Sequence, residues 1–304
     1  MSSFVVGIDL GGTGTRFARM DPEGTVLDRF VVATPHTGGA EEALTFFRNA
    51  FERLADGRLA ARDQSALRAI GIGASGPIDS SGVIRNPDTL PAFSNFDLTP
   101  LLRDAFGVPS VIENDAVVAA LAEDSRGAAR GSANLLHVTL GTGIGVAMIV
   151  DGSPVRGADG IHPEAGHLTV RGDAPCYCGR AACWEQVASR RALQRAAERV
   201  TGRTAVEAID SLAAAAHTPD ARRVFQHYGA RLGEGLATLI ELYRPSLVVL
   251  GGSAARMLPH FGSALDASLA ETAGRMLDFR VAPTELDDFG GAIGAGLTAA
   301  RLLR

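Results

Sequence analysis

The chain of 304 residues has few cysteines and no long hydrophobic or basic run. No apolar stretch reaches the roughly 20 residues that a membrane-spanning helix needs, so we expect no membrane segment. The net charge is −5 and the positive charges do not cluster, which argues against a nucleic-acid partner. The N-terminus enters a strand-like run without a signal peptide, so we expect a cytoplasmic protein. Cysteines stay reduced there, and their odd number, three, fits metal ligation better than a disulfide framework.

Glycine and aliphatic residues are abundant instead. Hydrophobic residues make up 46% of the chain, and 36 glycines punctuate it. The length allows two domains of ordinary size. Helical spacing of apolar residues predicts helices within residues 40–67, 116–129 and 185–201. Because such segments alternate with short β-branched runs, we expect a layered α/β architecture with mainly parallel sheets.

All three cysteines lie in one turn-rich segment, residues 162–185. Cys176, Cys178 and Cys183 have the spacing C-x-C-x4-C, and His167 precedes the first of them by nine residues. One imidazole and three thiolates match a tetrahedral structural zinc site. Three packed, reduced cysteines beside an incidental histidine are the alternative interpretation, but clusters with this spacing in cytosolic proteins favour zinc.

Two glutamates flank this segment without being needed as ligands. Glu164 lies three residues before His167, and Glu185 lies two residues after Cys183. Each carboxylate could accept hydrogen bonds from a pair of hydroxyl groups. A metal takes one ring nitrogen of His167, which leaves the other N–H for an acceptor such as a substrate hydroxyl. The alternative for both glutamates is a solvated surface position.

A strand–glycine turn–strand pattern occurs twice. FVVGIDL, from Phe4, is followed by GGTG and a second strand-like run, and NLLHVTL is followed by GTGIG and VAMIV. The two patterns overlay at a constant offset of 130 residues, which places Asp9 opposite Thr139. Hairpins with glycine turns are common, but the match in both position and context predicts a duplicated α/β domain.

Glycine turns at strand ends allow backbone N–H groups to approach a phosphate closely. Asp9 is placed to hold hydrated Mg²⁺ beside such phosphates. The pattern G-x-G-x-x-G and the lysine of a P-loop are both missing, which leaves facing hairpins as in the actin-like ATPases. A tight hairpin is the alternative for any single turn. As a set, the turns predict nucleotide binding by Asp9, Gly11, Gly12, Thr13, Gly141, Thr142, Gly143, Gly251 and Gly252.

Asn114 and Asp115 follow a strand-like run and precede an alanine-rich helix. Both residue types are preferred helix N-caps, which is a purely structural interpretation. Asp115 also falls at the carboxyl end of a strand, where open α/β sheets place their ligands. A carboxylate there can accept the proton of a substrate hydroxyl during attack on a γ-phosphate. The dipeptide alone leaves both interpretations open.

Together, these motifs resemble the ROK (repressor, open reading frame, kinase) family of sugar kinases over nearly the whole chain. DLGGTGTR is similar to the family's first phosphate motif, GTGIG to its second, ASGPID to its sugar loop and IENDAVVAALAE to its catalytic N-D segment. LGGS is similar to its adenosine turn, and PEAGH with CYCGRAACWE to its E-x-G-H and C-x-C-G-x-x-G-C-x-E pair. The resemblance implies two actin-like (ribonuclease H-like) α/β domains around a central cleft. The first would comprise residues 1–117 and a final helix at about 290–304, and the second, larger domain residues 118–289 with the zinc loop.

The resemblance also implies roles for individual residues. It makes ATP with Mg²⁺ the co-substrate, Asp115 the general base and Zn²⁺ a structural ion on His167, Cys176, Cys178 and Cys183. It further implies a homodimer. Sugar contacts are expected from Gly76, Asn114, Asp115, Glu164, His167 and Glu185.

The chain departs from the family pattern at three places. Thr89 stands where glucokinase-like members often carry an asparagine that contacts the sugar. His162 and Pro163 before Glu164 look more like the fructokinase branch, although the cysteine cluster, which that branch tends to vary, is intact. Ala182 replaces the glycine before the third cysteine. These differences bear on which sugar is bound and leave the kinase motifs complete.

We therefore expect an ATP-dependent hexose kinase of glucokinase type that phosphorylates glucose at its 6-hydroxyl. Fructokinase, mannokinase or N-acetylhexosamine kinase activity are alternatives within the family, and polyphosphate is an alternative donor. A sugar-binding transcriptional regulator is disfavoured, because such members carry a helix-turn-helix domain before the first phosphate motif, which begins here at Phe4.

Overall fold

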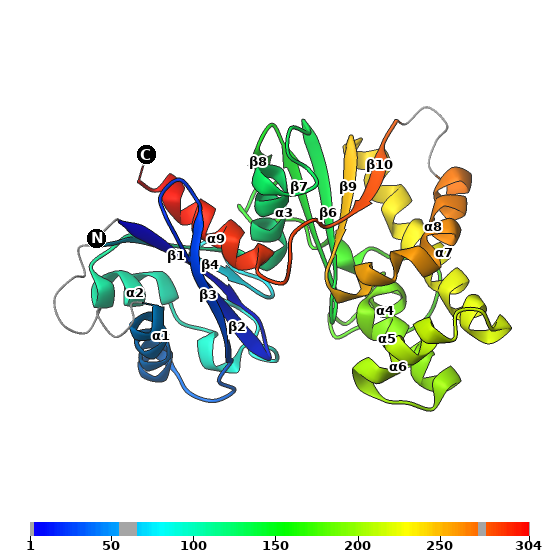
Figure 1. Ribbon diagram of the computed structural model, residues 1–304, viewed down its shortest axis with the longest axis horizontal. Helices are drawn as coiled ribbons and strands as arrows, with labels where there is room; N and C mark the ends of the chain where they lie inside the picture. Colours follow the sequence, from blue (N-terminus) through cyan, green and yellow to red (C-terminus); the bar gives the residue numbers. More distant parts are fainter. Residues whose placement is uncertain (1–2, 55–65, 273–277, 304) are drawn as a thin grey trace. The chain divides into compact units, whose positions relative to one another are not determined.

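The computed structural model describes residues 3–54, 66–272 and 278–303, which form two compact units. Unit 1 comprises Met1–Arg130, Pro154–His162 and Leu286–Arg304, and unit 2 comprises Gly131–Ser153 and Pro163–Glu285. Each unit is built on a five-stranded sheet with helices packed against it (Figure 1). No helix within these described ranges is long and apolar enough to cross a membrane.

The sheet of unit 1 has the strand order β3-β2-β1-β4-β5. Strand β1 pairs antiparallel with β2 and parallel with β4. The strands are β1 (Phe4–Leu10), β2 (Gly14–Met20), β3 (Val26–Ala33), β4 (Leu67–Ala74) and β5 (Ser110–Asn114). The helices are α1 (Ala40–Leu54), η1 (Pro91–Phe93), α2 (Leu98–Phe106), α3 (Asp115–Arg126) and α9 (Gly290–Arg301).

Both faces of the unit 1 sheet are buried. Val6 and Ile8 of β1 point into a cluster that includes Phe47 of α1, as the two-residue period of a strand requires. On the other face α9 lies so close that a Cβ at Gly7 would be 1.9 Å from the carbonyl oxygen of Ala292. Only glycine permits this approach, which brings the start of α9 to the end of β1.

The sheet of unit 2 has the order β10-β9-β6-β7-β8, and β6 pairs antiparallel with β7 and parallel with β9. The strands are β6 (Asn134–Leu140), β7 (Ile144–Val150), β8 (Ser153–Pro154), β9 (Leu247–Gly251) and β10 (Arg280–Pro283). The helices are η2 (Ala165–His167), α4 (Glu185–Ala188), α5 (Arg190–Thr201), α6 (Ala205–Ala214), α7 (Pro219–Tyr243), η3 (Ser253–Met257) and α8 (Leu258–Thr272).

The two units repeat one plan, with an antiparallel hairpin joined to two parallel strands. The hairpin strands β1 and β2 begin at residues 4 and 14, and β6 and β7 begin at 134 and 144. Both predicted hairpins are therefore confirmed at the predicted offset. The expectation of mainly parallel sheets is wrong, because each hairpin adds antiparallel pairs and makes the sheets mixed.

Helix boundaries differ from the predicted ranges. Of the helix predicted within 40–67, α1 covers Ala40–Leu54, and residues 55–65 lie outside the described part of the chain. The helix predicted over 185–201 is two helices, since Ser189 has an extended backbone and caps α5 by accepting the N–H of Ala192. The domain boundary expected between residues 117 and 118 falls inside α3, all of which belongs to unit 1.

Candidate active site

The first glycine turn of unit 1 joins β1 to β2 and is held in shape by its neighbours. The Thr34 hydroxyl donates to the carbonyl oxygen of Gly11 at 2.6 Å. A Cβ at Gly12 would lie 2.7 Å from Cγ2 of Thr89. The residue that departs from the glucokinase pattern thus touches the predicted phosphate turn.

Asp9 ends β1 beside this turn. Its carboxylate lies 3.7 Å from Nη1 of Arg16 and against Gly291, where a Cβ would be 3.0 Å from the Asp9 Cγ. Burial raises the pKa of Asp9 to about 6, and the Arg16 charge opposes this shift. The carboxylate is therefore ionised above pH 6, the form that holds a hard cation.

Asn114 and Asp115 lie at the junction of β5 and α3. Asn114 is buried, and its Oδ1 accepts the N–H of Ala116 at 2.8 Å, so the helix-cap interpretation is correct for this residue. Its Nδ2 donates to the carbonyl oxygen of Gly76 at 3.3 Å, which joins two predicted sugar-contact residues. Asp115 is the first residue of α3, where the positive end of the helix dipole favours a carboxylate.

The second and third glycine turns meet in unit 2. Gly252 follows β9 with a φ of 78°, and a Cβ there would lie 2.6 Å from the carbonyl oxygen of Leu140. Gly252 thereby brings the predicted adenosine turn to the end of β6, where the turn of Gly141 and Gly143 begins. The amide of Gly141 donates to the carbonyl oxygen of Gly143 at 3.1 Å.

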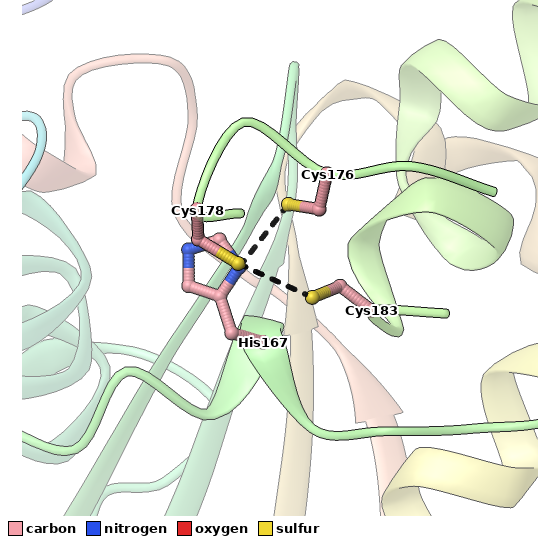
Figure 2. Close-up of side chains that lie close together, drawn as sticks. All are labelled: His167, Cys176, Cys178 and Cys183. Carbon is pink, nitrogen blue, oxygen red and sulfur yellow. Dashed lines mark hydrogen bonds between the residues drawn. The ribbon is translucent and has the colours of Figure 1, made fainter. Parts of the chain in front are cut away.

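Four side chains of unit 2 converge as predicted from the cysteine spacing. Figure 2 shows His167, Cys176, Cys178 and Cys183 pointing toward one another, and one ligand atom from each lies within 4.8 Å of the others. The loop is closed by isolated β-bridges, one of which pairs Thr169 with Cys183. The donor set, three sulfur atoms and one imidazole nitrogen, suits a tetrahedral zinc ion.

Backbone geometry and burial act differently on the thiols of this cluster. A hydrogen bond from the backbone N–H of Arg180 lowers the pKa of Cys178 to about 6, which favours the thiolate that binds metal. Burial raises the pKa of Cys183 to about 12.

Ala182, which replaces the expected glycine, has a φ of 61°, so this position does require the left-handed conformation that glycine adopts readily.

The two glutamates have different environments. Glu185 is buried, with Oε1 3.8 Å from His167 Nδ1 and 3.4 Å from Cys176 Sγ. Its other oxygen faces Gly143, at which a Cβ would be 2.5 Å from Oε2. Glu164 is exposed and precedes η2. The surface interpretation therefore fails for Glu185, which lies between the cysteine cluster and the phosphate turn.

A model of the ROK family matches residues 5–301. The chain belongs to the ROK family. A glucokinase of Halalkalibacterium halodurans is 30% identical over 96% of this chain and 93% of its own. Among solved structures, a ROK hexokinase from Thermus thermophilus has a TM-score of 0.82, with 34% identity and 99% of each chain covered. A ROK family glucokinase from Streptomyces griseus, solved with glucose and AMPPNP, has a TM-score of 0.78 and 30% identity, covering 98% of this chain and 100% of that one. These structures share the actin-like fold of this ROK protein.

Two aromatic residues at this ROK site were not predicted. The Tyr177 hydroxyl lies 3.1 Å from His167 Nε2. Burial and then the charges of Glu185 and Glu164 raise the pKa of this phenol. Trp184 is fully buried, and its Nε1 donates to the carbonyl oxygen of Arg231 on α7 at 3.0 Å. In the sequence, the only signal for Tyr177 was its position between Cys176 and Cys178, and the only signal for Trp184 was its position between Cys183 and Glu185.

Proposed function

We propose that this ROK protein is an ATP-dependent hexose kinase with glucose as its preferred substrate and the 6-hydroxyl as the phosphorylated group. The relatives named glucokinase and hexokinase, which cover nearly the whole chain, support a sugar kinase. The complete set of phosphate turns in both hairpins supports a nucleotide donor. Polyphosphate is the competing donor.

The position of Glu185 carries the proposal. Its carboxylate is buried, and within the described part of the chain its side-chain partners are His167, Cys176 and Gln186, with no arginine among them. Its Oε2 lies against Gly143 of the phosphate turn. A buried carboxylate needs hydrogen-bond donors, and the hydroxyl groups of a sugar would supply them beside the group that receives a phosphate.

The cysteine cluster fits a structural Zn²⁺. Three sulfur atoms and one imidazole nitrogen already lie within 4.8 Å of one another, and Sγ of Cys178 and Cys183 are 3.6 Å apart without a disulfide. Zinc would supply the cross-link that fixes the loop. In this proposal the loop in turn fixes Glu164, His167 and Glu185, which contact sugar hydroxyls.

Asp115 is proposed as the general base. As the 6-oxygen of the hexose attacks the γ-phosphorus, its proton passes to the Asp115 carboxylate, the bond from the γ-phosphorus to the β,γ-bridging oxygen breaks, and ADP leaves. The Asp115 Oδ1 accepts the N–H of Ala116 at 2.8 Å, which restrains the carboxylate. Mg²⁺ bound with ATP supplies charge neutralisation, and Asp9 would hold it through water.

A sugar panel tests the substrate. ADP release is measured with glucose, fructose, mannose, N-acetylmannosamine and N-acetylglucosamine, with ATP or polyphosphate as donor. We expect the highest kcat/KM with glucose and ATP. A preference for fructose would agree with the resemblance of His162 and Pro163 to the fructokinase branch and would overturn the proposal that glucose is the preferred substrate. If no sugar stimulates ADP release, the kinase proposal is overturned.

The variant Asp115→Asn tests the base. We expect kcat to fall by about two to four orders of magnitude, the usual contribution of a general base, with the fold intact. The matched control is Asp104→Asn on α2, an exposed carboxylate that pairs with its neighbour Arg103. Near-normal turnover of Asp115→Asn would remove Asp115 from this role.

A further inference from the structure

In the sequence, Tyr177 lies between Cys176 and Cys178, the first two cysteines of the cysteine cluster. The residue is 79% exposed, yet its hydroxyl lies 3.1 Å from Nε2 of the buried His167. The two rings meet edge to face, with centroids 5.2 Å apart and an interplanar angle of 76°. An exposed tyrosine thus places its one polar atom on a buried imidazole.

The cluster decides which nitrogen of His167 carries the hydrogen. Nδ1 faces Cys176 Sγ at 3.5 Å and Glu185 Oε1 at 3.8 Å, on the side where the ligand atoms converge (Figure 2). A metal on Nδ1 leaves the ring hydrogen on Nε2. This single N–H then donates to the Tyr177 hydroxyl, and it cannot donate to a second acceptor at full strength.

The proposed function requires the same N–H for a sugar hydroxyl. The Tyr177 hydroxyl also lies within the electrostatic influence of Glu185 and Glu164, the two carboxylates assigned to the sugar. The phenol hydroxyl on His167 Nε2 occupies the place that a sugar hydroxyl would take on the same nitrogen. Tyr177 therefore stands in for the ligand.

We propose that Tyr177 is a displaceable cap on the sugar site: its hydroxyl accepts the His167 Nε2–H in the sugar-free protein and leaves when a hexose hydroxyl takes that hydrogen. The inference rests on the proposed function. Because Tyr177 is already 79% exposed, its departure uncovers little apolar surface. The cap weakens the binding of a hexose whose hydroxyl faces His167 by the strength of one hydrogen bond, because that hydroxyl must displace the Tyr177 hydroxyl.

The variant Tyr177→Phe tests the cap by calorimetry on the metal-loaded protein without ATP. A hydrogen bond contributes a net of about 0.5–1.5 kcal/mol, so we expect the Kd for the preferred hexose to fall by about 2- to 10-fold. Among monodeoxy analogues of that hexose, one should bind with the same Kd to wild type and Tyr177→Phe, because it lacks the hydroxyl that displaces the cap. The matched control is Tyr243→Phe at the end of α7, which should leave every Kd unchanged.

A second measurement reports the displacement directly. The chain has three tyrosines, so ζ-¹³C-labelled tyrosine gives three signals, and Tyr177→Phe identifies one. We expect hexose to shift that signal and to leave the zinc content unchanged. If wild type binds hexose but Tyr177→Phe binds it equally or more weakly, or if the signal does not move, Tyr177 is not a displaceable cap. If wild type binds no hexose, the proposed function fails instead.

Discussion

The substitution Gly235→Ala tests how the loop that carries Cys176, Cys178 and Cys183, which we propose to contact the sugar, is anchored within unit 2. Gly235 lies on α7, and the Trp184 ring packs directly on it: a Cβ there would be 2.3 Å from Cδ2 and Cε2 of the indole. Trp184 is fully buried, and in the sequence it stands between Cys183 and Glu185. Its backbone N–H donates to the carbonyl oxygen of Leu168 at 2.8 Å. The indole therefore cannot withdraw without moving Cys183, a predicted metal ligand, and Glu185, a proposed sugar contact.

The expected loss of stability combines three effects. Overpacking of a filled core costs about 1–3 kcal/mol, and loss of the hydrogen bond from Trp184 to Arg231 costs about 1 kcal/mol. Replacing glycine by alanine inside a helix stabilises the helix by about 1 kcal/mol and offsets part of this loss. The net expectation is a decrease of about 1–3 kcal/mol in the free energy of unfolding, with a larger loss of affinity for hexose than for ATP.

Urea denaturation and calorimetry with hexose and with an ATP analogue check both parts of this prediction. The matched control is Gly262→Ala on α8, where the nearest atom to the added Cβ is Leu258 Cδ1 at 3.5 Å, an ordinary contact. That variant should be neutral or slightly stabilised. The reasoning is refuted if Gly235→Ala is as stable as Gly262→Ala, or if its hexose affinity is unchanged.

Three further substitutions test other parts of the site. Gly252→Ala should weaken ATP binding more than hexose binding, because its Cβ would lie 2.6 Å from the carbonyl oxygen of Leu140. Gly131→Ala, with a φ of 83° but no atom within 4 Å of the added Cβ, controls for backbone conformation alone. Equal effects of the two substitutions on ATP binding would contradict this prediction. Cys178→Ser should lower zinc content and weaken hexose binding more than ATP binding, and equal losses in calorimetry would indicate general unfolding. Burial lowers the pKa of His137 to about 4, so the unfolded chain binds a proton that the folded chain rejects. The stability due to neutral His137 is present above pH 6.5 and is lost by up to about 3 kcal/mol toward pH 4; in urea titrations His137→Gln should flatten this slope, and an unchanged slope would refute the assignment.

The hairpins and the cluster of three cysteines with His167 could be predicted because their signals are local. Glycines between two apolar runs specify a turn, and a short spacing of cysteines brings the thiols together whatever the rest of the fold does. The constant offset of 130 residues predicted the second hairpin from the first, and both bounds of β6 lie 130 residues after those of β1. Local patterns therefore located most of the residues proposed for the site.

The surroundings of those residues could not be predicted, because they depend on contacts distant in sequence. A buried environment for Glu185 requires Gly143, which is 42 positions earlier, and nothing near Glu185 in the sequence indicates it. The break between α4 and α5 was missed because helical spacing continues through Ser189, which caps the second helix instead. The mixed sheets follow from pairings between hairpins and distant strands, which periodicity does not report.

The same long-range contacts join the phosphate turn and the sugar-facing loop into one structure within unit 2. The N–H of Arg190, at the start of α5, donates to the carbonyl oxygen of Gly141 at 2.9 Å, and Glu185 lies against Gly143. A phosphate that orders this turn would also restrict the carboxylate proposed to hold the sugar. Since coupling between two ligands is reciprocal, sugar bound at Glu185 would favour the phosphate to the same extent. The metal loop would therefore serve phosphoryl transfer by linking recognition of the acceptor to recognition of the donor.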